Sequence, residues 1–221
     1  ESLNKPGYWL LTHEFDRWTF GVSKFDESHY DYGEIQIGET HSNDNNDFGA
    51  NRGAIGYITS SIQGDKIAIA IEGQKMIEVL RFNNETGHLQ PFTQLPAGDS
   101  DNKKSFLHQA YGVAFSPSGR FLYGTSRDQG ILYQWDLLSP NIIEEAYLLR
   151  NNSESPCGAL QLAPNGRIYV AVSGQDYVGV INHPDRLGKR AQYTEYGARL
   201  IDNETGNGGT GTLGLPQFDM S

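Results

Sequence analysis

The stretch from Gly158 to Val172 reads GALQLAPNGRIYVAV, and the chain contains two earlier versions of it. The second version, GVAFSPSGRFLYGTS, begins at Gly112, and the third, GYITSSIQGDKIAIA, begins at Gly56. Each has an apolar run, a turn containing Gly, a basic residue and a second apolar run. Short apolar or alternating runs bounded by turn residues predict strands, and a Gly that accepts positive φ suits the tight turn between them. The repeated unit is therefore a β-hairpin.

Each hairpin is followed by a third apolar run and a looser fourth segment. After the version at Gly112, for example, these are ILYQWDL (131–137) and EEAYLLR (144–150). Equivalent glycines lie 46 to 56 residues apart. Four antiparallel strands at such a spacing predict the blades of an all-β β-propeller. The alternative is a β-sandwich whose hairpins look alike by chance, but three copies with Gly, turn and basic residue in register favour the propeller.

The repeat divides the chain into nearly four blades within one propeller domain. The first blade lacks its first strand, and LGLPQF at the other end matches only a first strand. Open sheet edges are avoided in natural proteins, so we expect further blades of the same polypeptide and a larger ring. The segment 213–218 is a candidate for closing the blade that begins at Tyr8. The predicted bounds are 8–51, 52–108, 109–156 and 157–212, with a closing strand at 213–218.

Composition excludes several classes of function. Lys and Arg number 17 against 27 Asp and Glu, a net charge of −10, which argues against a nucleic-acid binder. The sequence contains no run of 18 apolar residues that would predict a membrane span. The first residues, ESLNKPGYWLL, show no signal peptide, but this absence does not make the protein cytoplasmic. Cys157 is the single cysteine, so no internal disulfide forms, and we expect a buried thiol rather than a reactive one.

Several strings, in this order, resemble the propeller region of large secreted surface proteins of Bacteroidota, associated with gliding motility or the type IX secretion system. They are YWLLTHEF, AYGVAFSPSGRFLYGTS, ILYQWDL, CGALQLAPNGRIYVAVSGQDYVGVINHPDRLG, YGARL and GTLGLPQF. The resemblance runs from Tyr8 to Phe218 and is most specific between Gly158 and Gly188. It implies an extracellular or outer-membrane-associated location and no defined chemistry, because a fold does not fix a function.

Residues for chemistry are scattered. The six histidines show no metal-binding spacing, although His13, beside Glu14, has a position that could face the channel. FSPSGRFLYGTS also occurs in propeller lactonases, which use channel carboxylates, His or Arg and sometimes a divalent ion. The candidates on that alternative are Glu14, Arg127 and Asp176, although Asp in a turn also caps its own backbone.

The segment SNDNNDFG (42–49) suggests a calcium loop but lacks the Gly and the Glu of the EF-hand pattern, so we interpret it as a surface loop. The sequence thus predicts no catalytic residue, no metal and no cofactor. Aromatic anchors for a partner are Trp18, in a hairpin turn, and Tyr30 and Tyr32 if they lie on a loop face. Trp135 is expected to be buried between blades.

The function that these observations favour is a non-enzymatic scaffold propeller that binds other proteins of a cell-surface or secretion complex, or a surface glycan. Its binding residues would be drawn from Trp18, His13, Glu14, Tyr30, Tyr32, Arg127 and Asp176. The alternative is a lactonase-like hydrolytic propeller that uses channel carboxylates and a divalent ion. A weaker third hypothesis is a module that binds a small ligand or sugar.

Overall fold

The computed structural model describes residues 7–26, 30–41, 55–96, 109–201 and 208–215. These residues form β-strands joined by turns, with two short 3-10 helices. The elements are β1 Tyr8–His13, β2 Thr19–Phe25, β3 Tyr30–Gln36, β4 Ile58–Ser60, β5 Lys66–Ile71, η2 Glu72–Gln74, β6 Met76–Phe82, β7 Leu89–Pro96, β8 Ala110–Phe115, β9 Phe121–Ser126, β10 Ile131–Asp136, β11 Tyr147–Asn151, β12 Cys157–Leu162, β13 Ile168–Val172, β14 Tyr177–Ile181, η3 Gly188–Ala191 and β15 Tyr193–Arg199.

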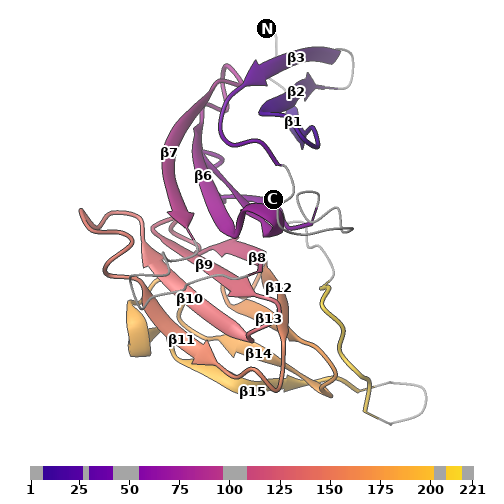
Figure 1. Ribbon diagram of the computed structural model, residues 1–221, viewed down its shortest axis with the longest axis vertical. Coiled ribbons are helices and arrows are strands. Elements are labelled where there is room, and N and C mark those ends of the chain that lie inside the picture. Colours follow the sequence, from indigo (N-terminus) through magenta and orange to yellow (C-terminus); the bar gives the residue numbers. More distant parts are fainter. Residues whose placement is uncertain (1–6, 27–29, 42–54, 97–108, 202–207, 216–221) are drawn as a thin grey trace, which may run out of the picture.

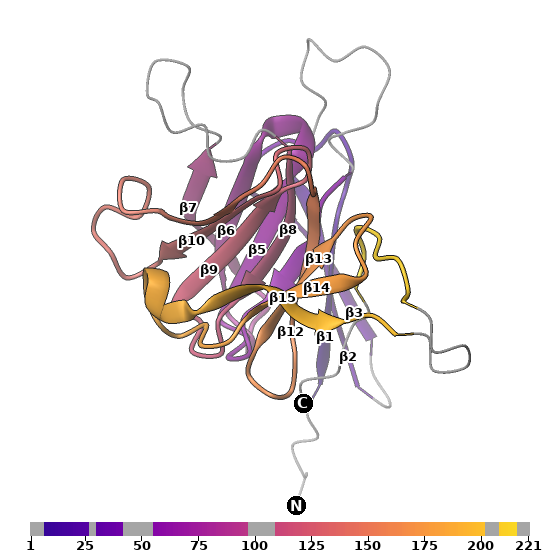
Figure 2. The same cartoon turned by 90° about the horizontal axis from the view of Figure 1, so that it is seen from below.

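The strands form four antiparallel sheets, in which neighbours along the chain are also neighbours in space. Three sheets have four strands, β4–β7, β8–β11 and β12–β15, and the sheet that precedes them is the three-stranded β1–β3. The sheets follow one another in an arc, with β1–β3 at one end and β12–β15 at the other (Figure 1). Viewed from below, β12–β15 lies nearest and β1–β3 farthest (Figure 2). The predicted all-β propeller of four-stranded blades is confirmed.

The hairpin turns of the repeat have the geometry that its glycines predict. Gly119 and Gly166 have φ of 69° and 73°, in the left-handed region that a side chain disfavours. In the turn before β9, Gly119 N donates to Ser116 O at 2.8 Å, and Ser116 N donates to Phe121 O at 2.8 Å. The Gly in each copy of the repeat therefore serves the backbone.

The hydrophobic core consists of layers between successive sheets. Phe20 and Val22 pack on Ile67 and Ile69 between the first two sheets. Equivalent layers join β4–β7 to β8–β11 and β8–β11 to β12–β15. Trp135 is 1 % exposed within the second of these three layers, as predicted. Because every layer is shared by two blades, each blade depends on its neighbour for stability.

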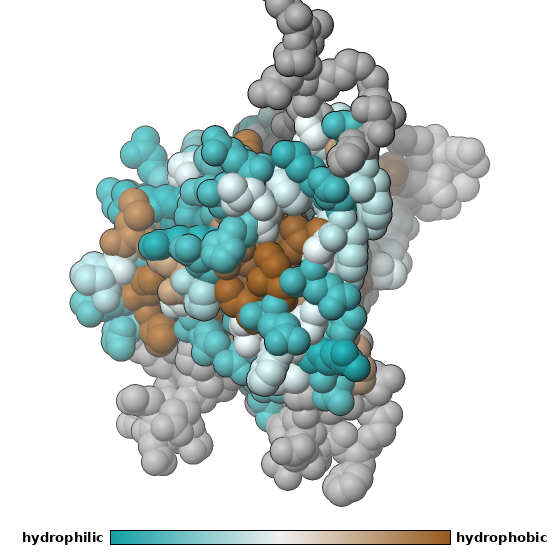
Figure 3. Space-filling model, turned by 90° about the horizontal axis from the view of Figure 1, so that it is seen from above, coloured by the Kyte–Doolittle hydropathy of each residue, from teal (hydrophilic) through white to brown (hydrophobic). Residues whose placement is uncertain are grey.

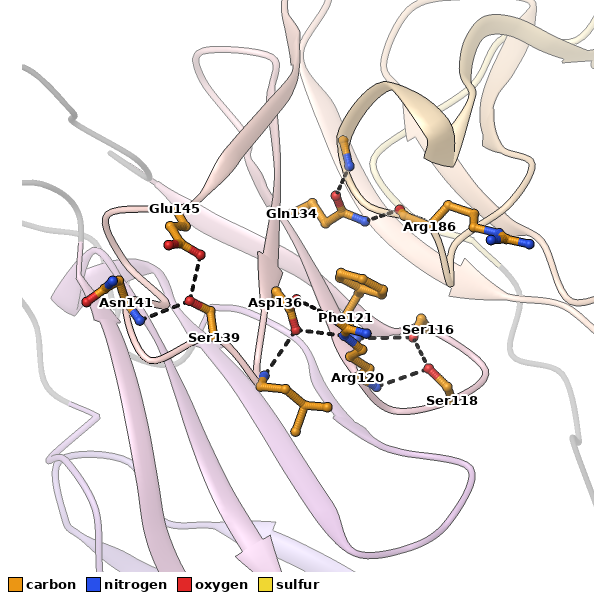
Figure 4. Close-up of polar contacts among 12 residues, drawn as sticks. Ser116, Ser118, Arg120, Phe121, Gln134, Asp136, Ser139, Asn141, Glu145 and Arg186 are labelled. Carbon is orange, nitrogen blue, oxygen red and sulfur yellow. Dashed lines mark hydrogen bonds and ion pairs between the residues drawn. The ribbon is translucent and has the colours of Figure 1, made fainter.

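Polar side chains fasten the loop before η3 to the preceding blade (Figure 4). The Gln134 amide donates to Arg186 O at 2.7 Å and accepts from Gly188 N at 2.7 Å. On the same blade, Arg120 forms a two-pronged pair with Asp136, with N···O distances of 2.9 and 2.6 Å. These contacts position loops and leave no polar group of Gln134 for a ligand.

The outward face of the first sheet is open and rich in aromatic side chains. Tyr8, Leu10, Phe25, Tyr30 and Tyr32 are between 38 % and 65 % exposed. An open hydrophobic patch is visible at this end of the molecule in Figure 3. Tyr30 and Tyr32 thus lie on β3, a strand, rather than on the loop face considered from the sequence. No helix in the described part of the chain has the length and apolar character to cross a bilayer.

The C-terminal described residues lie against the innermost strand of the last blade. Ala159 N donates to Leu213 O at 2.7 Å, so Leu213 runs alongside β12. Residues 216–218 of the predicted closing strand lie outside the described residues. Completion of the first blade by this segment therefore stays a prediction.

Candidate functional site

The second strands of successive sheets end on the same face of the propeller, where the innermost strands begin. In an antiparallel blade the second strand ends beside the start of the first. Two backbone hydrogen bonds show this: Glu72 N donates to Ile55 O at 3.1 Å, and Arg127 N donates to Gln109 O at 2.9 Å. Residues that directly follow β1, β5 and β9 therefore gather with those that directly precede β4 and β8.

A cavity of about 220 Å³ opens on this face between the first sheet and β4–β5. Its wall is formed by the end of β1, by His41 and by the entry into β4. Most of the lining side chains are aliphatic or aromatic. The lining residues are Leu11, Thr12, His13, Phe15, His41, Ile55, Gly56, Tyr57, Ile58, Ile69 and Ala70.

Two histidines stack in the wall of the cavity. The imidazole rings of His13 and His41 have centroids 3.3 Å apart and planes within 12° of parallel. Phe20 meets His13 edge-on, with a centroid distance of 4.5 Å. Backbone hydrogen bonds hold His41 against the turn after β1: Asp16 N donates to His41 O at 3.2 Å, and His41 N donates to Arg17 O at 3.4 Å.

Burial keeps both imidazoles neutral. Burial, and secondly the neighbouring His13, lowers the pKa of His41 to about 3. Burial also lowers the pKa of His13, and a backbone hydrogen bond at Glu14 offsets part of that effect. His41 is 7 % exposed, and its Nε2 atom has no hydrogen-bond partner among the residues that the structure describes. A neutral imidazole can accept a proton, and it does so less readily the further its pKa lies below the working pH.

A series of contacts between aromatic and charged side chains leads from the cavity to the next blade. Tyr57 lines the cavity, and its ring lies 5.4 Å from that of Tyr111. Burial, and secondly Tyr111, raises the pKa of Tyr57, so its hydroxyl stays protonated as a donor. The Arg127 guanidinium lies 6.0 Å from the Tyr111 ring centroid, and its Nη2 donates to Glu72 Oε1 at 2.9 Å. The Glu72 side chain is fully buried, so this ion pair ties two blades together.

The residues predicted from the sequence are only partly brought together. His13 lines the cavity, and Arg127 belongs to the adjoining chain of contacts. Trp18 lies in the turn before β2 and is 54 % exposed, and Glu14 in that turn pairs with Arg17 at 3.5 Å. Asp176 pairs instead with Arg199 of its own blade, at 3.1 Å. Tyr30 and Tyr32 face outward on β3, away from the layer shared with β4–β7.

Sequence reasoning missed His41, Tyr57, Tyr111 and Glu72. Glu72 was within reach, because it follows β5 as Arg127 follows β9 in the repeat. His41 follows a segment with no equivalent in the other blades, so the pattern contained no signal for it.

No metal centre is evident in the ranges that the structure describes. No three His, Cys, Asp or Glu side chains of these ranges converge as ligands would. The segment 42–49, considered above for calcium, lies outside the described residues. The single thiol, Cys157, is buried, as predicted.

The fold and this face define a β-propeller with a cavity near the start of its innermost strands. No protein-family model matches the chain, and no curated protein sequence matches it. Among solved structures it is similar to a proposed 6-phosphogluconolactonase from Bacteroides uniformis, with 16 % identity, a TM-score of 0.52, and coverage of 81 % of this chain and 51 % of that one. A periplasmic gluconolactonase from Pseudomonas aeruginosa is similar at 15 % identity and a TM-score of 0.51, with coverage of 81 % and 50 %. A proposed 6-phosphogluconolactonase from Bacteroides fragilis matches at 10 % identity and 0.51, with coverage of 85 % and 55 %.

These neighbours correct the functional expectation. The sequence favoured a non-enzymatic scaffold of the type IX secretion or gliding machinery, and that expectation is wrong: the similar structures are named as lactonases. Nothing in the comparison points to gliding motility or secretion. Identities of 10 to 16 % establish the fold, and the chain spans about half the length of these neighbours. Activity is therefore a matter for proposal.

Proposed function

We propose that the chain contributes to a propeller hydrolase that opens the ring ester of a lactone. The observation that carries the proposal is the cavity with two stacked, neutral imidazoles on the face where the innermost strands begin. The lactonase names of the similar propellers support the same reaction class. Because the chain spans about half of each neighbour, the activity of a complete ring is part of the proposal.

The chemistry needs one base and one hydrogen-bond donor. A water molecule attacks the lactone carbonyl carbon while an imidazole of the His13–His41 pair, for which His41 is the candidate, accepts its proton. The carbonyl oxygen becomes an oxyanion, which the protonated hydroxyl of Tyr57 is suited to stabilise. The tetrahedral intermediate then collapses, the ring C–O bond breaks, and the leaving ring oxygen takes the proton from the imidazolium. The products are a hydroxy acid and the regenerated neutral base.

The remaining groups position this pair. Tyr111 packs on Tyr57, and Arg127 packs on Tyr111 while paired with Glu72. The version of the mechanism with channel carboxylates and a divalent ion does not fit the described residues, because Glu14 and Asp176 pair with arginines at separate turns.

The test is lactone hydrolysis measured in a pH-stat, corrected for spontaneous opening. His41→Gln should lower kcat/KM about 100-fold or more, the usual range for loss of a general base. His183→Gln is the matched control, because His183 is exposed in the loop before η3, and it should leave kcat/KM unchanged. Full activity in His41→Gln would remove His41 from the mechanism, and a complete ring that hydrolyses none of the lactones tested would refute the hydrolase.

The location is a separate proposal. The sequence from Gly158 to Gly188 resembles Bacteroidota surface proteins, which supports a location outside the cytoplasm, with further blades of the same polypeptide completing the ring. Fractionation of the source cells, with detection by an antibody to this chain, tests the location. Recovery in the cytoplasmic fraction alone would contradict it.

A further inference from the structure

The part of the cavity wall that the structure describes has no permanent charge. None of its lining side chains in the described ranges is Asp, Glu, Lys or Arg, and burial holds its two histidines neutral. Leu11, Ile55, Ile58 and Ile69 give it an aliphatic surface, and Phe15 adds an aromatic ring. The polar groups available to a ligand are confined to Thr12, Tyr57, the two imidazoles and the backbone.

The arginines near the cavity are already paired with carboxylates. Arg127 reaches Glu72 at 2.9 Å, and Arg17 in the turn after β1 reaches Glu14 at 3.5 Å. A phosphate group that entered the cavity would lose its hydration without gaining a counter-charge from this wall, which is strongly unfavourable.

The cavity lining suits a lactone ring with an alkyl substituent better than a ring that carries several hydroxyl groups. Each buried hydroxyl requires a hydrogen-bond partner, whereas an alkyl substituent gains from contact with aliphatic side chains. Four aliphatic lining residues against a few polar groups favour the second kind of ligand.

We propose that this cavity selects an uncharged lactone with a short hydrocarbon substituent over a phosphorylated sugar lactone. The inference rests on the proposed hydrolase function and names its substrate class. It departs from the 6-phosphogluconolactone that the names of two similar structures suggest.

The test compares kcat/KM for δ-hexalactone, δ-gluconolactone and 6-phosphogluconolactone under identical conditions. We expect the order in which they are given, with the phosphorylated substrate at least about 100-fold below δ-hexalactone. An equal or higher value for 6-phosphogluconolactone would overturn the substrate class while leaving the hydrolase intact. No hydrolysis of any of the three would refute the hydrolase itself, and the substrate class with it.

A charge placed in the wall gives a second readout. Ile58 lines the cavity and is 44 % exposed, so Ile58→Lys can be tolerated by the fold. It should raise the ratio of kcat/KM for 6-phosphogluconolactone to that for δ-hexalactone about 10-fold or more. Ile62→Lys is the control, because Ile62 is 50 % exposed and does not line the cavity. Equal ratios in both variants would show that the cavity does not hold the substrate and would overturn the proposal.

Discussion

Glu72 and Arg127 are 55 residues apart in sequence, yet Glu72 Oε1 accepts a hydrogen bond from Arg127 Nη2 at 2.9 Å. Each residue directly follows the second strand of its blade. Repetition of the blade thus places equivalent positions side by side on one face. Opposite charges at two such positions fix the relative placement of two blades beside the candidate site.

The first prediction concerns the asymmetry of this pair. Arg127→Met removes the cation that pairs with the fully buried Glu72 carboxylate and should cost about 3 kcal/mol of the free energy of unfolding. Glu72→Gln should cost less, about 1 kcal/mol, because Arg127 is 31 % exposed and water can solvate it. Urea denaturation measures both. Arg199→Met is the control: its pair with Asp176 is exposed, so the loss should stay below about 1 kcal/mol.

The second prediction concerns acid stability. The pKa of His41 is about 3 in the folded protein and about 6.5 when exposed, so the unfolded chain binds the proton more readily. Stability from this group is therefore complete above pH 6.5 and is lost as the pH falls toward 3, by roughly 1.4 kcal/mol per pH unit. His41→Phe keeps a ring to stack on His13 and removes the titration.

Thermal or urea unfolding between pH 7 and pH 4.5 is the measurement. The wild-type chain should lose about 2.5 kcal/mol more than His41→Phe over that interval. The carboxylates titrate in both proteins, so the difference between them isolates the histidine. Parallel pH profiles would contradict the burial of a neutral His41.

The fold could be predicted from the sequence, whereas most of the candidate site could not. The Gly-turn-basic pattern at Gly56, Gly112 and Gly158 specifies hairpins through backbone geometry, which is local, so the strands and their order were predictable. The site depends on contacts between blades. His41 stacks on His13, but His41 belongs to a connecting segment that has no equivalent in the other blades. Tyr57 contacts Tyr111 only because their two blades are neighbours in space. Glu14 and Asp176 looked equivalent in sequence, but each is neutralised by its own arginine.

The third prediction concerns Cys157. Burial raises the pKa of its thiol to about 12, and its Sγ donates to Ile131 O at 3.2 Å. A protonated, buried thiol reacts slowly with disulfide reagents, because the thiolate is the nucleophile. Labelling of the native chain by a thiol reagent should be at least roughly 100-fold slower than in denaturant. Rapid labelling without unfolding would mean that β12 is not packed on β8–β11.

The last prediction uses two glycines of the hairpin GALQLAPNGRIYVAV. A Cβ at Gly158 would collide with the backbone of Leu213, whose Cα would lie 2.7 Å away. Gly158→Ala must therefore displace the segment 213–215 and weaken the hydrogen bond from Ala159 N to Leu213 O. We expect a loss of about 1–3 kcal/mol, in the range for overpacking, and faster hydrogen exchange at the Ala159 amide.

Gly166→Ala in the same hairpin is the matched control. No atom lies within 4 Å of a Cβ at Gly166, so only its positive φ of 73° opposes the substitution, at a cost of about 1 kcal/mol. Exchange at the Ala159 amide should then stay at the wild-type rate, because the turn lies at the other end of the hairpin from Gly158. If the Ala159 amide exchanged no faster in Gly158→Ala than in Gly166→Ala, Leu213 would not be paired with β12. The edge of β12 that Leu213 covers would then be open to another strand.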